Sequence, residues 1–143
     1  MASIRSRIIR KPRQQAVMSD YEGDIKALIG RAANLVRNTA VQSINQGSKS
    51  GVTYEKYNPR RTHKSSSAGQ PPATDTGFLV QNIIIVMDIA DKGLSANVES
   101  RANYSTFLEF GTRNMGARPF MQPALEENRA KIRRLAKQII RAK

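Results

Sequence analysis

A long helical pattern near the N-terminus constrains the fold more than any other feature of this sequence. Ser19 and Glu22 have the spacing of a capping box, and Gly47 is a suitable C-terminal cap. Residues 20–46 are therefore predicted to form a helix of about 40 Å. It is either a single amphipathic core helix or one that packs on a sheet and also faces a neighbouring molecule. The apolar residues that recur at helical spacing are Ile25, Leu28, Ile29, Ala32, Val36 and Ile44.

Two further patterns predict strands. Residues 82–88 are apolar and β-branched, which is typical of a buried strand. Asp91, Lys92 and Gly93 then form a tight turn, and residues 94–99 alternate as a return strand, so we predict a hairpin. Residues 52–57 also alternate, which predicts a short separate strand.

Two helices are predicted in the C-terminal third of the chain. Residues 103–110 are predicted to form a short helix that lays its aromatic side chains on the sheet. Pro123 suits the first position of a last helix that continues to about residue 141. The predicted fold class is α+β, with a small antiparallel sheet packed by the long N-terminal helix and the C-terminal helix.

The 143 residues suit one domain with an N-terminal arm. Residues 1–18 are rich in Arg, and Pro12 interrupts any helix there, so we expect a basic flexible arm. Residues 19–143 form the predicted domain. Within it, residues 58–77 hold three prolines, two glycines and three consecutive serines, which predicts a long loop without regular structure.

The composition argues against several kinds of site. No Cys is present, which excludes a disulfide framework and a Cys nucleophile. His63 is the only histidine, and its closeness to Ser65 and Asp75 along a loop is not triad geometry. We therefore expect no enzyme, no cofactor and no metal site. No apolar run approaches the roughly 18 residues of a membrane span, so no membrane contact is expected.

The formal net charge of +13 indicates a polyanionic partner, an acidic protein surface or a solvated basic face. The predicted C-terminal helix concentrates this charge. Its basic residues are either a solvated face or the lining of a lumen that sees DNA, with contacts to phosphate and no sequence preference. A nonspecific double-stranded DNA-binding module is thus the alternative function. The residues concerned are Arg129, Arg133, Arg134, Lys137 and Arg141.

Four runs, in this order between two helices, carry a family resemblance. Residues 60–64 read RRTHK, residues 67–79 read SAGQPPATDTGFL, residues 104–112 read YSTFLEFGT and residues 118–124 read RPFMQPA. Together they resemble the gene-product-ten-like family of tail-completion, or neck, proteins of bacteriophages with long non-contractile tails (HK-ninety-seven type). The resemblance covers about residues 20 to 140. The family usually has Pro where this chain has Ser or Ala around positions 67–68.

The resemblance implies a virion structural protein, assembled in the host cytoplasm, that forms a homo-oligomeric ring at the head-proximal end of the tail. It implies a role in head–tail joining, with tail-terminator, tail-tube or head-connector proteins as neighbours. The loops at 58–77 and 112–119 are the candidate contact patches, and Phe120 is expected to be a buried anchor. The candidate interface residues are Arg60, Arg61, His63, Asp75, Gly77, Glu109, Gly111, Arg113, Arg118 and Phe120.

Overall fold

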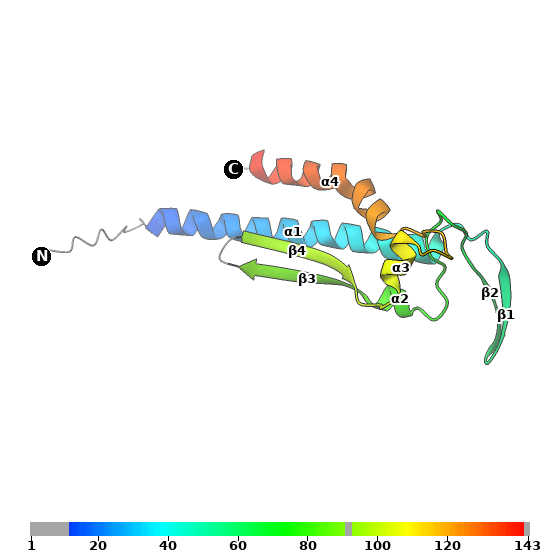
Figure 1. Ribbon diagram of the computed structural model, residues 1–143. Helices are drawn as coiled ribbons and strands as arrows, with labels where there is room; N and C mark the ends of the chain where they lie inside the picture. The colour runs from blue at the N-terminus through cyan, green and yellow to red at the C-terminus, as the bar shows by residue number, and fades with distance from the viewer. Residues whose placement is uncertain (1–11, 91–92, 142–143) are drawn as a thin grey trace, which may run out of the picture.

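The computed structural model describes residues 12–90 and 93–141, and its architecture is α+β, as predicted. The long helix α1 runs along the middle of the molecule, between α4 and the β3–β4 hairpin (Figure 1). The β1–β2 hairpin lies beyond the C-terminal end of α1. The elements are α1 (Pro12–Gln46), β1 (Thr53–Tyr57), β2 (Arg60–Lys64), α2 (Phe78–Gln81), β3 (Ile83–Ala90), β4 (Gly93–Ser100), α3 (Ser105–Phe110) and α4 (Met121–Arg141).

Helix α1 is longer than the sequence pattern predicts. It has 35 residues, about 52 Å at about 1.5 Å per residue. The capping box at Ser19 is wrong, because Ser19 lies inside the helix. Pro12 is instead the first helical residue, where a proline costs no hydrogen bond and its fixed φ suits the helix. The predicted arm is therefore wrong for residues 12–18, and residues 1–11 lie outside the described residues.

The predicted β3–β4 hairpin is confirmed. The strands pair antiparallel from Ile83 opposite Ser100 to Ala90 opposite Gly93. Ile83 is fully buried against α1, and Val98, on the same face, packs against the core. Residues that alternate with these, such as Asp88 and Glu99, lie on the face directed away from α1.

A second hairpin corrects the predicted loop at 58–77. Arg60–Lys64 is a strand, β2, which pairs antiparallel with β1 from Thr53 opposite Lys64 to Tyr57 opposite Arg60. The turn between the strands contains a cis peptide bond before Pro59. The strand was missed because all but one of its residues are exposed, so it has no apolar periodicity. Residues 65–77 have neither helix nor strand, as predicted.

The core is small and mostly aliphatic. Phe120 is 1% exposed and is the one aromatic residue in it, so its predicted burial is confirmed. Helix α4 begins at Met121, so Pro123 is the third helical residue and not the first as predicted. The core residues are Val36, Ala40, Ile44, Leu79, Ile83, Ala102, Phe120 and Ala124.

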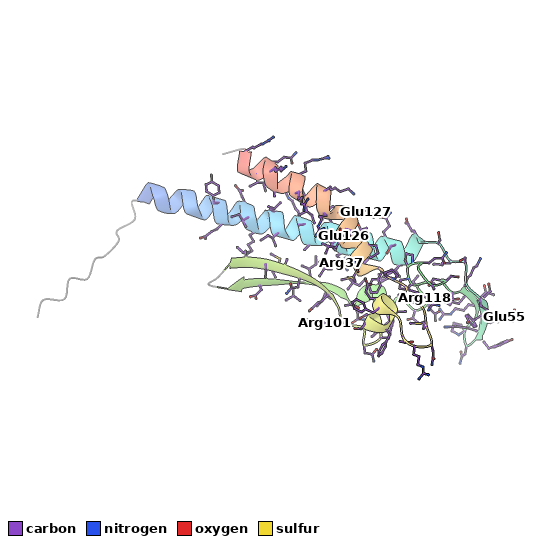
Figure 2. All side chains as sticks on the ribbon, turned by 45° about the horizontal axis from the view of Figure 1, so that its top comes forward. Arg37, Glu55, Arg101, Arg118, Glu126 and Glu127 are labelled. Atoms are coloured by element: carbon purple, nitrogen blue, oxygen red, sulfur yellow. The ribbon has the colours of Figure 1, made fainter. Side chains whose placement is uncertain are left out.

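Two polar side chains hold α1 to its neighbours. Arg37 lies on α1 near the centre of the molecule (Figure 2), and its Nε donates to the carbonyl of Ile83 at 2.8 Å. Asn128 on α4 is fully buried, and its Nδ2 donates to Thr39 Oγ1 of α1 at 2.8 Å. These bonds fix the helices and the hairpin as one body, from which the β1–β2 hairpin projects (Figure 1).

Candidate subunit interface

The predicted interface residues gather beyond the middle of α1, around α3 and the β1–β2 hairpin. Figure 2 shows Arg118 between the helical body and the hairpin that carries Glu55. Three local arrangements are found there: an ionic cluster on Asp75, a loop fixed by Glu109, and a set of exposed aromatic side chains. The basic face of α4 forms a separate region.

The Asp75 cluster, made of Asp75, Lys56, Arg61 and His63, ties the β1–β2 hairpin to the segment that precedes α2. Lys56 Nζ donates to Asp75 Oδ2, and Arg61 Nη2 lies 2.8 Å from Asp75 Oδ1. His63 Nδ1 is 3.9 Å from the same oxygen. The hydrogen bond from Lys56 lowers the pKa of the Asp75 carboxyl, partial burial opposes this, and the charges of Arg61 and His63 lower it further. One carboxylate therefore holds two cationic side chains of one strand pair, Lys56 and Arg61, and lies beside His63.

A cleft of about 280 Å³ opens beside the Asp75 cluster. His63 and Asp75 line one part of it, while Tyr104 and Arg118 line another. Gly77 also lines the cleft and precedes α2 with a φ of 79°, in the left-handed region that favours glycine. Five of the predicted interface positions therefore lie in or beside one concave site: Arg61, His63, Asp75, Gly77 and Arg118.

Glu109 fixes the start of α4. Its carboxylate accepts hydrogen bonds from the amides of Phe120, Met121 and Gln122 at 2.9, 3.0 and 2.9 Å. These amides have no partner within the helix, and a negative charge there is also favoured by the helix dipole. The contacts that the structure gives Glu109 are thus internal, since they join α3 to α4. Its role between subunits stays a prediction.

The loop between α3 and α4 is held by its backbone. Gly111 has a φ of 77°, and a Cβ there would lie 2.8 Å from the carbonyl oxygen of Met115, so only glycine fits. The amide of Arg118 donates to the carbonyl of Leu108 at 2.6 Å. The Arg118 Nε is buried without a hydrogen-bond partner among the described residues, while Arg113 is exposed. The loop therefore presents Arg113 outward on a constrained backbone.

The aromatic residues lie mainly on the surface, which corrects the prediction for residues 103–110. Phe107 is 55% exposed and Phe110 is 74% exposed, whereas Ser105 is buried. The inward side of this short helix is therefore taken by Ser105 and Leu108, which packs against the core. Of the eight aromatic residues, six are exposed, and we call them the aromatic set: Tyr54, Tyr57, Phe78, Tyr104, Phe107 and Phe110.

The aromatic set is carried by three elements at one end of the molecule, β1, α2 and α3, and by the residue before α3 (Figure 1). Phe78 and Tyr104 contact each other, with ring centroids 6.2 Å apart. Partial burial raises the pKa of Tyr104. Exposed aromatic side chains gathered beside Arg residues are the composition that protein interfaces favour.

Helix α4 is amphipathic, and the predicted basic residues lie on its outer side. Ile132 packs against the core, while Glu126 near the start of the helix (Figure 2) forms an ion pair with Arg129 at 3.3 Å. Lys131 pairs with Glu127 at 4.0 Å. The other four described cations of α4 have no ion pair with any residue that the structure describes. They are Arg133, Arg134, Lys137 and Arg141, and all are exposed.

Sequence reasoning missed two groups of residues at this end. Lys56 was not singled out, although alternation places it on the same face of the hairpin as Arg61, its cross-strand partner. The aromatic residues of 103–110 were expected to lie on the sheet, because sequence alone does not say which side of a six-residue helix faces inward. The core that the structure shows is small and mostly aliphatic, so it has room for few aromatic rings.

Among residues 12–90 and 93–141, no three His, Cys, Asp or Glu side chains are placed to bind a metal ion together. No helix in that part of the chain has the length and hydropathy to span a membrane. Comparisons with protein-family models, with curated proteins and with solved structures give no match.

Proposed function

We propose that this chain is a phage virion structural protein, a tail-completion or neck component that forms a ring at the head-proximal end of the tail. In this role it supports head–tail joining. The observation that carries the proposal is the surface position of six of the eight aromatic residues, gathered at one end beside cationic side chains. Large aromatic side chains left in water are costly for a monomer and are expected where another protein covers them.

The shape of the molecule supports the same function. The β1–β2 hairpin projects from the body (Figure 1), and all of its strand residues except Lys56 and His63 are exposed. A two-stranded hairpin is marginally stable alone, so one held out from a domain is better suited to a partner's surface than to the fold of its own chain. Projecting parts that fit a different surface of the next copy generate rings when the rotation closes.

The sequence resemblance supports the proposed position of the ring at the head-proximal end of the tail. The four runs that resemble the gene-product-ten-like family include the Asp75 cluster residues of β2, the Gly77 turn, the Glu109 helix and the Phe120 turn. These runs build the end of the molecule that carries the candidate interface. Tail-terminator, tail-tube or head-connector proteins are the expected neighbours of such a ring.

The proposal is tested by electron microscopy of the purified chain and of phage particles. Rings that form with rising protein concentration in the absence of DNA, and immunogold label at the head-proximal end of tails, are expected. A strict monomer that labels no part of a particle would contradict the proposed function.

The basic face of α4 favours a second candidate, a nonspecific double-stranded DNA-binding module. If all four unpaired cations contact phosphates, a plot of the logarithm of the DNA association constant against the logarithm of the salt concentration should have a slope of about −3.6. A steep slope of this size in a chain that stays monomeric would favour the second candidate. A ring with a shallow slope would favour the first. The matched variant replaces Arg133, Arg134 and Lys137 with Glu, which should abolish the slope without unfolding the chain.

A further inference from the structure

We infer that the outer face of the β1–β2 hairpin of one copy docks on the outer face of the β3–β4 hairpin of the next copy, through paired opposite charges. This inference rests on the proposed ring and names the two surfaces that would build it. The occupant of each surface is a second copy of this chain.

The first surface is the side of the β1–β2 hairpin that faces away from Asp75. Lys56, Arg61 and His63 all turn toward Asp75, so the alternating residues must lie on the opposite face. Arg60 and Lys64 are on that outer face, and both are exposed without an ion pair to any described residue. Glu55, opposite Thr62, is on the same face and accepts a hydrogen bond from the Tyr57 hydroxyl at 3.3 Å, so the face has a net charge of +1. Tyr57, directly opposite Arg60, is 77% exposed and adds an apolar contact.

The second surface is the side of the β3–β4 hairpin that faces away from α1. Because Ile83 and Val98 are turned toward α1 and the core, Asp88 and Glu99 lie on the outer face. Asp88 is exposed and has no ion pair with a described residue. Glu99 is 48% exposed, and its one such pair, to Arg101, is long at 3.9 Å.

The charges of the two hairpins are opposite in a chain that is otherwise strongly basic. Residues 83–100 contain three acids and one lysine, a net charge of −2, whereas the whole chain carries +13. Residues 53–64 contain four cations and one acid, a net charge of +3. Two copies of a +13 chain repel each other, so a stable contact between them must bring the acidic segment of one to a basic segment of the other.

The spacing of the charges also agrees. Arg60 and Lys64 are four residues apart along β2, which is about 13 Å at about 3.3 Å per residue. Asp88 is four residues along β3 from Ile84, and Ile84 is paired directly with Glu99. The two carboxylates therefore have the same offset along their hairpin as the two cations, and the long side chains of Arg and Lys span the remaining sideways displacement.

The two surfaces are distinct, as a ring requires. The β1–β2 hairpin lies beyond the C-terminal end of α1, while the β3–β4 hairpin runs back along α1 (Figure 1). The two surfaces have net charges of opposite sign, so the contact is expected to join different patches of successive copies. Such a contact leaves one free patch at each end of a chain of subunits until the ring closes.

The chain has no cysteine, which makes disulfide trapping a clean test. The double variant Lys64→Cys with Asp88→Cys, oxidised at a concentration where the wild-type chain assembles, should give a ladder of covalent oligomers. Each single variant should give nothing larger than a dimer. The control double variant, Lys137→Cys with Asp88→Cys, pairs the same acid position with an equally exposed cation on α4 and should give no ladder.

Charge reversal gives an independent readout. Arg60→Glu with Lys64→Glu should weaken assembly about tenfold or more, because like charges then face each other. Adding Asp88→Lys and Glu99→Lys should restore it. If wild-type rings form but neither the ladder nor the rescue is seen, the docking inference fails and the ring stands. If no assembly and no ladder form at any concentration, both fail.

Discussion

The two hairpins of this protein are held in opposite ways. β3–β4 packs one face on α1, with Ile83 fully buried and the Arg37 side chain bonded to its backbone. β1–β2 has only Lys56 and His63 partly buried. Its ion pairs to the rest of the described chain all involve the Asp75 carboxylate, and Arg61 also donates to the Asp75 carbonyl at 3.4 Å. A hairpin held by burial takes part in the stability of the whole domain. A hairpin held by partly exposed charges can be released or recaptured without unfolding the domain.

Under the proposed function, the two hairpins would have different roles. The buried hairpin gives a rigid surface, and the charge-tethered hairpin gives a projecting element that can adjust to a partner. Local regions with few apolar contacts are expected to open at much lower free energy than the core. Four substitutions or changes of condition can break or sharpen the comparison.

The largest effect is expected in the core that supports β3–β4. Phe120→Ala should lower the free energy of unfolding by about 3–5 kcal/mol, because Phe120 is 1% exposed and is the largest side chain of the buried core cluster. Denaturant unfolding of the monomer measures it. Phe110→Ala, at a residue 74% exposed, is the matched control and should change stability by less than about 0.5 kcal/mol. A loss under about 1 kcal/mol at Phe120 would show that the core does not depend on it.

The next effect is at the junction of the two regions. Glu109→Gln keeps the shape of the side chain but removes the charge that three amides share, so a loss of about 1–3 kcal/mol is expected. Glu22→Gln, an exposed change of the same kind on α1, serves as control. Equal unfolding curves for the two variants would mean that water replaces the carboxylate at the start of α4.

Sequence patterns predict the buried half of the molecule well. The apolar run that forms β3 and the helical spacing along α1 are burial signals, and burial is what hydrophobic periodicity records. The start of α1 was misplaced because Ser19 and Glu22 match a cap that the helix passes through, and Pro12 is compatible with a helix start.

For the β1–β2 hairpin and Asp75, the sequence predicted which residues belong to the site but not how they are arranged. Arg61, His63 and Asp75 were selected from the sequence, and the structure brings them together. That Arg60–Lys64 is a strand could not be read from its residues, because its register depends on pairing with β1 and on Asp75. The exposure of Phe107 and Phe110 likewise depends on how a six-residue helix is oriented, which only tertiary contacts determine.

A smaller and local effect is expected at the Asp75 cluster, the tether that ties the β1–β2 hairpin to the segment before α2. Asp75→Asn should leave the global unfolding curve unchanged while trypsin cuts after Arg60, Arg61 or Lys64 severalfold faster, because the hairpin opens locally. In the assembled form of the chain, cleavage at these residues should be slower than in the monomer. Glu55→Gln, at an exposed residue of the same hairpin, is the control. Unchanged cleavage in Asp75→Asn would show that backbone contacts alone hold the hairpin in place.

The smallest effect is expected from acid, because the pKa of Asp75 is lowered from its ordinary value of 3.8 by the hydrogen bond from Lys56. A carboxyl with a lowered folded-state pKa stabilises the tether at every pH above that ordinary value. The contribution is lost only as the pH falls below it, through the folded-state pKa. The side-chain carboxyl carbon signal of Asp75 in NMR spectra should therefore complete its titration below the ordinary value of 3.8, and not around it. In Asp75→Asn this transition should be absent while the signals of β3 keep their own acid response. An Asp75 carboxyl signal that titrates at or above that ordinary value would show that Lys56 does not stabilise the carboxylate.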